Sequence, residues 1–156
     1  MSNESEIKRY LDHIASWNWA AIKNRTDPMG AKAIRMTIEI CAAYQDTRVL
    51  DMFKNIIAEN PDSGLAWYCI AKTLFDFRKM NESLNFALVR AHKLGCDYIR
   101  VSGNALLYDH TVGMENTCTI RLETGNQESI INRFMRLSDE DAKKWWDRNN
   151  TSLLDG

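Results

Sequence analysis

The acid–histidine neighbours of this chain are the residues that most directly suggest chemistry. Asp12-His13 and Asp109-His110 each place a carboxylate beside an imidazole, and Cys118 follows the second pair by a few residues. Neighbours on a helix do not face each other, so neither pair is by itself an acid–base unit. An enzyme is therefore a hypothesis only for residues 98 to 125, where Asp109, His110 and Cys118 would have to converge on one pocket.

Other chemical signatures are missing from the sequence. No nucleophile motif, glycine-rich phosphate loop or His/Glu metal motif occurs. The four cysteines lie far apart without a Cys-x-x-Cys pair, which favours buried thiols over a metal or disulfide role. The sequence predicts no catalytic residues, no metal ligands and no cofactor. The four cysteines are Cys41, Cys69, Cys96 and Cys118.

The composition favours one globular domain that spans residues 1 to 156. Hydrophobic residues make up 45% of the 156 residues and charged residues 26%, with a formal net charge of −1. A chain that binds nucleic acid generally carries a clear basic excess, so this balance disfavours that class. No apolar run reaches the 18 residues of a membrane span and the N-terminus lacks an apolar signal core, so we expect a cytoplasmic protein without a membrane partner.

Helical periodicity dominates the first two thirds of the chain. Only Pro28 and Pro61 interrupt it, and caps are expected at Asp46-Thr47 and Asn81, with Gly95 ending a helix. The pattern predicts helices over residues 3–23, 29–44, 48–59, 64–78 and 82–94.

The pattern is weaker beyond residue 97. Residues 98 to 110 are expected to form another helix, although Gly103 disfavours it. The β-branched run from Asn116 to Gly125 predicts an extended segment, with a small hairpin or irregular structure near residues 114 to 125. Helices are predicted again over residues 127 to 137 and after Ser138. The fold class is thus mainly all-α, and residues 98 to 156 are expected to form a C-terminal cap opposite an N-terminal helix within residues 1 to 29.

A repeat of 34 residues relates the two central helix pairs. Trp67, Ile70, Ala71 and Leu74 alternate large and small side chains at the spacing that lets paired helices pack, and weaker equivalents precede them by 34 residues. The stretch AENPDSGLAWYCIAKTLFDFRKMNESLNFAL resembles the tetratricopeptide repeat family, and the likeness covers residues 30 to 97. Ala33 departs from the family pattern, because a large aromatic is usual at that position.

The resemblance implies a short solenoid of stacked antiparallel helix pairs with a concave groove. The resemblance further implies that the protein acts as an adaptor or regulatory module, which binds a segment of a partner protein in this apolar groove. The alternative is that terminal segments of the same chain fill the groove, and a homo-oligomer also remains open. The resemblance places Ala31 and Cys41 in the groove beside the expected partner-binding residues, which are Ile34, Ile38, Leu65, Tyr68, Lys72 and Phe75.

A basic stretch with aromatic neighbours suggests an alternative function, the binding of nucleic acid. Phe75, Phe77 and Tyr98 lie among six cations between residues 72 and 100, a mixture that suits a nucleic-acid accessory protein. The commoner explanation is a solvated helix surface. The six cations are Lys72, Arg78, Lys79, Arg90, Lys93 and Arg100.

The tryptophans near the C-terminus predict a packing surface. Trp145 and Trp146 are adjacent, and neighbours on a helix point in different directions. At least one of them is therefore expected to contact another surface, either the body of the domain or a second subunit.

Overall fold

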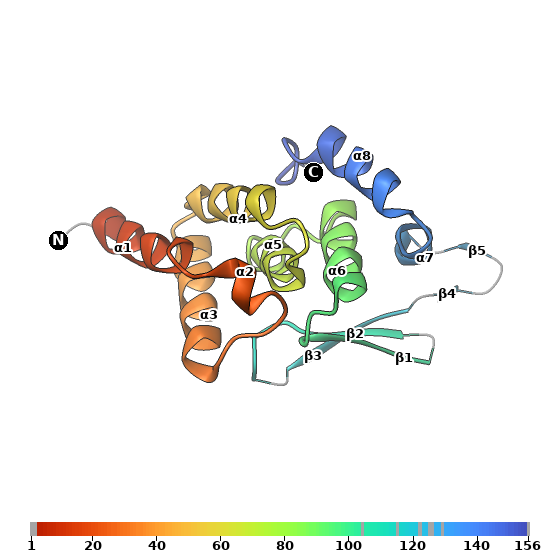
Figure 1. Cartoon of the computed structure of the whole chain (residues 1–156), viewed down its shortest axis with the longest axis horizontal. Coiled ribbons are helices and arrows are strands. Elements are labelled where there is room, and N and C mark those ends of the chain that lie inside the picture. Colours follow the sequence, from red (N-terminus) through yellow and green to blue (C-terminus); the bar gives the residue numbers. More distant parts are fainter. Residues whose placement is uncertain are drawn as a thin grey trace.

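A computed structural model describes residues 3–103, 105–114, 116–121, 123–124, 127–128 and 130–155. Among these residues, six helices precede a small three-stranded antiparallel sheet. A two-stranded ribbon follows the sheet, and two further helices follow the ribbon (Figure 1). The chain is thus mainly helical, as expected. In the described part, no helix is long and apolar enough to cross a membrane.

The N-terminal segment forms two helices, α1 (Asn3–Ala15) and α2 (Trp19–Ile22), so the single helix predicted over residues 3–23 is wrong. Two polar contacts accompany the break. The Ser16 hydroxyl donates to the carbonyl of His13 at 2.6 Å, and the Trp19 indole donates to the carbonyl of Ile14 at 3.0 Å. These groups satisfy carbonyls at the end of α1, where helical partners are missing.

The first central pair consists of α3 (Pro28–Ala43) and α4 (Arg48–Glu59), close to the predicted bounds. The Asp27 carboxylate accepts the amide of Gly30 at 2.7 Å, which caps α3 while Pro28 occupies its first turn. Before α4 the carboxylate of Asp46 accepts the amide of Arg48, whereas Thr47 makes no side-chain cap bond.

The second central pair, α5 (Gly64–Asp76) and α6 (Glu82–Leu94), contains the core of the molecule. Ser63 and Asn81 cap the two helices through their side chains, and Gly95 ends α6 with a φ of 100°. Helix α5 is seen almost end-on in Figure 1, between α3, α4 and α6. It is buried from Gly64 to Leu74, so it contacts neighbours on every side.

The segment after α6 forms strands, so the helix expected over residues 98–110 is wrong. Strands β1 (Ile99–Ser102), β2 (Ala105–Asp109) and β3 (Thr117–Arg121) pair antiparallel in that order. Along β2, Leu106 and Tyr108 are buried and their neighbours are half-buried, a period of two that belongs to a strand. Gly103 has a φ of 58° between β1 and β2.

The extended segment expected from residue 116 is present as β3, followed by the ribbon β4 (Glu123–Thr124) and β5 (Gln127–Glu128). Leu122 and Gly125, which belonged to that prediction, lie outside the described residues. The chain then returns to helices α7 (Ile130–Met135) and α8 (Asp139–Asn149), with Ser138 capping α8.

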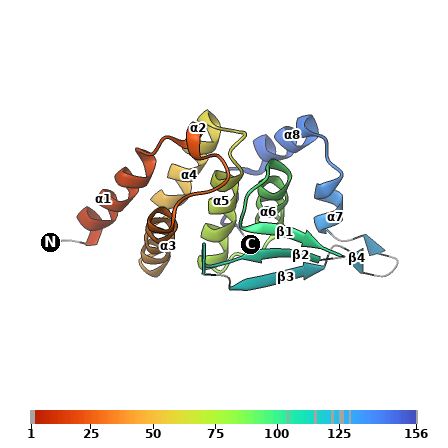
Figure 2. The ribbon, with the colours of Figure 1, turned by 60° about the horizontal axis from the view of Figure 1, so that its bottom comes forward.

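The helices and the sheet occupy different sides of the molecule. Figure 2 shows the three-stranded sheet below α5 and α6, with α7 and α8 at the far end from α1. Helix α5 packs against both α3 and α4, and α6 packs against α7. The tetratricopeptide resemblance of the two central pairs stays a prediction.

Candidate functional site

The residues expected to line a concave groove are mostly covered by their own chain. Ile34, Ile38 and Leu65 have no exposed surface, and Tyr68 is 1% exposed. Phe75 is half-buried, with its ring centroid 6.3 Å from that of Tyr108 and 5.2 Å from that of His110. We call these five residues of α3 and α5 the covered face, because four of them are buried and the segment after α6 contacts Tyr68 and Phe75.

Hydrogen bonds hold this cover in place. The Tyr68 hydroxyl donates to the carbonyl of Asp109 and accepts the amide of Val112 at 3.3 Å. The Arg35 guanidinium donates to the carbonyls of Thr111, at 3.2 Å, and of Val112, at 2.7 Å. Burial raises the pKa of the Tyr68 phenol, which therefore remains protonated and able to donate at neutral pH. The segment from residue 108 to residue 113 thus occupies the space expected for a partner.

Lys72, the cation expected in that groove, is an internal ion-pair partner. Its side chain is 1% exposed, and its ammonium lies 2.8 Å from a carboxylate oxygen of Asp76 and 3.8 Å from one of Glu39. A buried ammonium requires such partners, because desolvation of an unpaired charge is costly. Lys72 therefore ties α5 to α3 and presents no free charge to a ligand.

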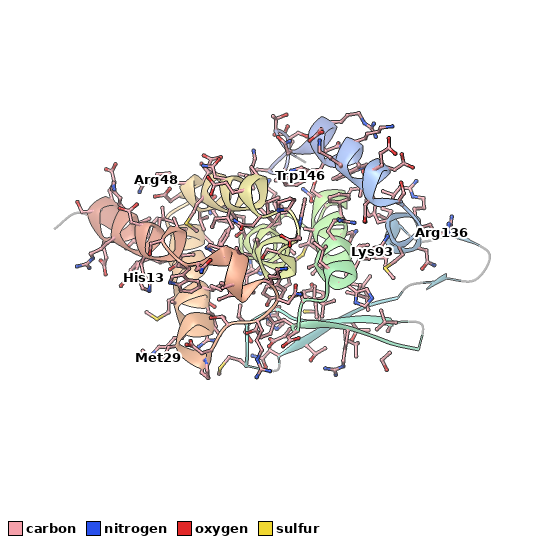
Figure 3. All side chains as sticks on the ribbon, in the orientation of Figure 1. His13, Met29, Arg48, Lys93, Arg136 and Trp146 are labelled. Carbon is pink, nitrogen blue, oxygen red and sulfur yellow. The ribbon has the colours of Figure 1, made fainter. Side chains whose placement is uncertain are left out.

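The basic stretch from residue 72 to residue 100 does not form one continuous surface. Arg90 is 9% exposed and its guanidinium lies 3.1 Å from Asp139. Lys93, labelled in Figure 3 between α6 and α7, donates to the backbone carbonyls of Met135 and Leu137 at the end of α7 and just after it. Of the six expected nucleic-acid contacts, Lys72 and Arg90 are therefore buried, and the exposed Lys93 is hydrogen-bonded to the backbone. Of the others, Arg78 and Arg100 are exposed and Lys79 is half-buried.

The three residues of the enzyme hypothesis do not converge. Cys118 pairs with Tyr108 across β2 and β3, and Asp109 is the next residue along β2, so its side chain lies on the opposite face of the sheet. The Asp109 carboxylate accepts the amides of Thr111 and Gly113, at 3.0 and 2.8 Å, within its own turn. The His110 ring packs against Phe75. Asp109 therefore stabilises a turn and does not orient His110 toward Cys118.

A second apolar surface lies between α4, α6 and α8, over the end of α5 that begins at Gly64. It encloses a volume of about 650 Å³, and we call it the aromatic groove. Within pockets of this size, apolar walls with a few polar groups are typical of ligand or partner sites. Its lining residues are Lys54, Asn55, Ile57, Ala58, Pro61, Asp62, Trp67, Phe86, Arg90, Leu94, Asp139, Ala142, Lys143, Trp146, Asp147 and Asn150.

Three rings form the floor of the aromatic groove. The centroid of Trp67 lies 4.7 Å from that of Trp146 and 5.7 Å from that of Phe86, both in edge-to-face geometry. In Figure 3 the labelled Trp146 lies between α8 and the ends of α5 and α6. Trp67 and Phe86 are buried, while Trp146 is only half-buried. The groove therefore exposes part of an otherwise internal aromatic cluster.

The walls of the groove are fixed by contacts that join distant parts of the chain. The Arg90–Asp139 ion pair ties α6 to the first turn of α8, and the Asn81 amide donates to the carbonyl of Leu153 at 2.9 Å. On the other side, the indole of Trp67 donates to the carbonyl of Pro61 at 3.2 Å. These contacts join α8 and the segment after it to α6, and the loop after α4 to α5.

The rim of the groove carries charges of both signs. Lys143 and Asp147 of α8 form an exposed ion pair at 3.3 Å, and Asp62 pairs with Lys23 at the same distance across the loop after α4. Between these charges Ala58 is exposed on α4, with no side chain large enough to cover the rings. The site is thus an apolar floor bordered by mixed charges.

The sequence identified part of this site. The prediction that at least one of Trp145 and Trp146 contacts another surface is confirmed for both, since Trp145 stacks on Phe86 at 4.1 Å and Trp146 meets Trp67. Phe86 was not predicted, because the expected groove residues all lie on α3 and α5 and Phe86 lies on α6. A signal was available, since Phe86 and Leu94 are large apolar residues of α6 that the repeat pattern does not use.

The cysteines lie mainly inside the protein. Cys41, Cys69 and Cys96 are buried and Cys118 is half-buried, all as free thiols. Burial raises the pKa of Cys41 to about 11 and that of Cys96 to about 12, so both thiols are protonated at neutral pH. Over the described residues, no three His, Cys, Asp or Glu side chains are grouped as a metal site would require.

Comparisons of the chain with protein-family models, with curated proteins and with solved structures find no match.

Proposed function

We propose that this chain is a protein-interaction module, an adaptor or regulatory subunit, that binds an amphipathic helix of a partner protein in the aromatic groove. The observation that carries the proposal is the exposed edge of the Trp67–Phe86–Trp146 cluster in an apolar groove. Aromatic clusters of this kind supply much of the binding energy at protein interfaces.

The border of the groove indicates the chemistry of the partner. An amphipathic helix lays an apolar stripe into a groove and places charged residues along both sides of that stripe. Lys54 and Lys143 would meet acidic flanks, and Asp62 and Asp147 would meet basic ones. The charged border would fix the register and orientation of the helix, while the rings provide the affinity.

A steric variant at Ala58 tests the proposal without disturbing the core. Ala58 is exposed near the end of α4 and lines the groove, so Ala58→Arg would place a long side chain over the rings. Ala15 is exposed at the end of α1 and does not line the groove, so Ala15→Arg is a matched control. A photo-crosslinking residue at position 58 should first capture the partner from nuclease-treated extract, and the crosslinked peptide should be an amphipathic helix.

The binding of that peptide by the variants then decides the matter. We expect Ala58→Arg to weaken it at least tenfold, about 1.4 kcal/mol, and Ala15→Arg to leave it unchanged. Equal binding by both variants would contradict the proposal, as would crosslinks at position 58 only to peptides without an apolar stripe.

A further inference from the structure

A second cavity lies on the opposite side of the molecule, between the start of α3 and the three-stranded sheet. It encloses about 860 Å³, within the range of sites that hold small molecules and cofactors. Met29, labelled in Figure 3, marks the first turn of α3, where Pro28 and Ala31 line this cavity. We call it the basic cleft. Its lining residues are Arg25, Thr26, Pro28, Ala31, Lys32, Arg35, Asp97, Tyr98, Ile99, Arg100, Leu107, Tyr108, Asp109, Val112, Gly113, Met114 and Thr117.

Cations from three separate segments converge on the basic cleft. Arg25 comes from the loop before α3, Lys32 and Arg35 come from α3, and Arg100 comes from β1. The carboxylates that face them are fewer, namely Asp97 and Asp109. The lining thus carries two more positive charges than negative ones, in a chain whose total charge is −1.

Both carboxylates of the cleft already have partners. Asp109 accepts backbone amides with both of its oxygens, as the turn that covers α3 and α5 requires. Asp97 lies 3.7 Å from the guanidinium of the exposed Arg25. In the part of the chain that the structure describes, Lys32 and Arg100 form no ion pair. These two exposed cations are therefore available to an anion.

Part of the cleft lining is apolar and contains aromatic surface. Tyr98 is half-buried, with its ring centroid 5.4 Å from that of Tyr68, and its hydroxyl donates to the carbonyl of Thr26. Leu107 is half-buried and Met114 is 57% exposed. A flat ring could therefore lie against Tyr98, Leu107 and Met114 while its charged group meets Lys32 and Arg100. A purely ionic ligand would leave this apolar surface exposed.

We infer that the basic cleft binds a nucleotide, with its phosphate on Lys32 and Arg100 and its base against Tyr98, Leu107 and Met114. Arginine and lysine are the side chains that proteins use for phosphate, and stacking on an aromatic ring binds any base. The nucleotide is either a free nucleoside monophosphate or one unit of a single-stranded nucleic acid. The cleft is distinct from the aromatic groove, so this inference does not depend on the proposed partner.

Titration of the whole chain with three probes tests this inference. Calorimetry with adenosine 5′-monophosphate, with inorganic phosphate and with a short single-stranded oligoadenylate should show saturable binding of the first and third. The affinity should fall as salt rises, because phosphate contacts release counterions. Affinity for the monophosphate equal to that for the oligoadenylate would identify a free nucleotide, and tighter binding of the strand would identify a nucleic acid.

A charge-matched pair of variants localises the binding. Lys32→Gln with Arg100→Gln should weaken binding of the monophosphate roughly tenfold or more, since two charge-assisted contacts are lost. Arg9→Gln with Arg148→Gln removes the same charge from exposed positions of α1 and α8 outside the cleft, and should change binding little. Thermal unfolding of both double variants should match that of the unmodified chain.

Three results would overturn the inference. The first is the absence of saturable binding of either nucleotide probe at low salt. The second is equal loss of binding in the two double variants, which would show attraction by net charge alone. The third is an affinity for inorganic phosphate as high as that for the monophosphate, which would show that the apolar wall contributes nothing and that no nucleotide is recognised.

Discussion

The covered face and the aromatic groove are both apolar surfaces of the central helices, but they differ in what lies over them. The covered face is closed by Tyr68 and Arg35, which bind the backbone of residues 109 to 112. The aromatic groove has a half-buried Trp146 and an open volume of about 650 Å³, with no segment of the described chain filling it. The same helices can thus present core on one side and a docking surface on the other, depending on where the rest of the chain packs.

Truncation of Tyr68 should give the largest effect and would break the covered face. Tyr68→Ala removes a buried ring and both hydrogen bonds to the turn, so we expect a loss of about 3–5 kcal/mol in the free energy of unfolding. Tyr68→Phe keeps the ring and should cost about 1–2 kcal/mol. Urea unfolding measures both. If Tyr68→Ala lowered the free energy of unfolding by less than Tyr68→Phe does, the turn would not depend on this side chain.

Loss of the internal cation should rank second. Lys72→Met leaves Asp76, whose side chain is 14% exposed, without its closest partner, and should destabilise the fold by about 1–3 kcal/mol. Replacing Asp76 with Leu in the same chain should recover part of that loss, because the unpaired carboxylate is then removed. Denaturant unfolding of the single and the double variant checks the pairing. A double variant that is less stable than Lys72→Met alone would count against it.

A pH-dependent effect of smaller size is expected in the turn that joins α3 of the covered face to α4 of the groove. The guanidinium of Arg48, hydrogen-bonded to Asp46, lowers the pKa of that carboxyl below its ordinary value. A carboxyl with a lowered folded-state pKa stabilises the fold above its unfolded pKa, and this contribution is lost as pH falls through the folded pKa.

Asp46→Asn should therefore be less stable than the unmodified chain at neutral pH, by less than Lys72→Met. The difference should close as the solution is acidified to below the folded pKa of Asp46. Unfolding curves of both proteins along a pH series measure this gap, and a gap that stays constant in acid would refute the role of the carboxylate charge.

The smallest effect on stability is expected at the groove itself. Ala58→Arg changes an exposed position near the end of α4, so the free energy of unfolding should stay within about 0.5 kcal/mol of the original value. The same variant should lose the partner helix. Stability unchanged with binding lost is the result that separates a docking surface from core, whereas a large loss of stability would place residue 58 in the packing.

The sequence predicted the helices best where local signals agreed. For α4 and α6 the apolar stripe, the residues before each helix and Gly95 after α6 all indicated the same bounds, and the structure has those bounds. It failed over residues 98 to 110, where a helix was expected although Gly103 disfavoured it. Burial there alternates along β2, and this alternation depends on pairing with β1 and β3, which lie apart in the sequence.

The site was harder to predict than the fold. The resemblance placed Ile34, Ile38, Leu65 and Tyr68 in a groove for a partner, but a repeat pattern does not show which segment of the chain will cover such residues, and all four are buried. The cover depends on long-range bonds such as that of Arg35 to Val112. The aromatic groove likewise requires α8 beside α6, where Trp145 stacks on Phe86 and Arg90 pairs with Asp139, contacts between residues far apart in the chain.

A reversible disulfide across the covered face most directly tests the central claim, that the partner binds in the aromatic groove and not at the covered face. A β-carbon added at Gly113 would lie 3.5 Å from that of Ala31, a separation that a disulfide can span, so Ala31→Cys with Gly113→Cys should join the turn to α3 when oxidised, although a side chain at position 113 is strained at its φ of 79°. Binding of the partner helix identified through position 58 is then measured on the oxidised and the reduced protein. We predict equal affinity in both states, because the groove lies on the other side. Binding only after reduction would contradict the account, since the covered face would then have to open to receive the partner.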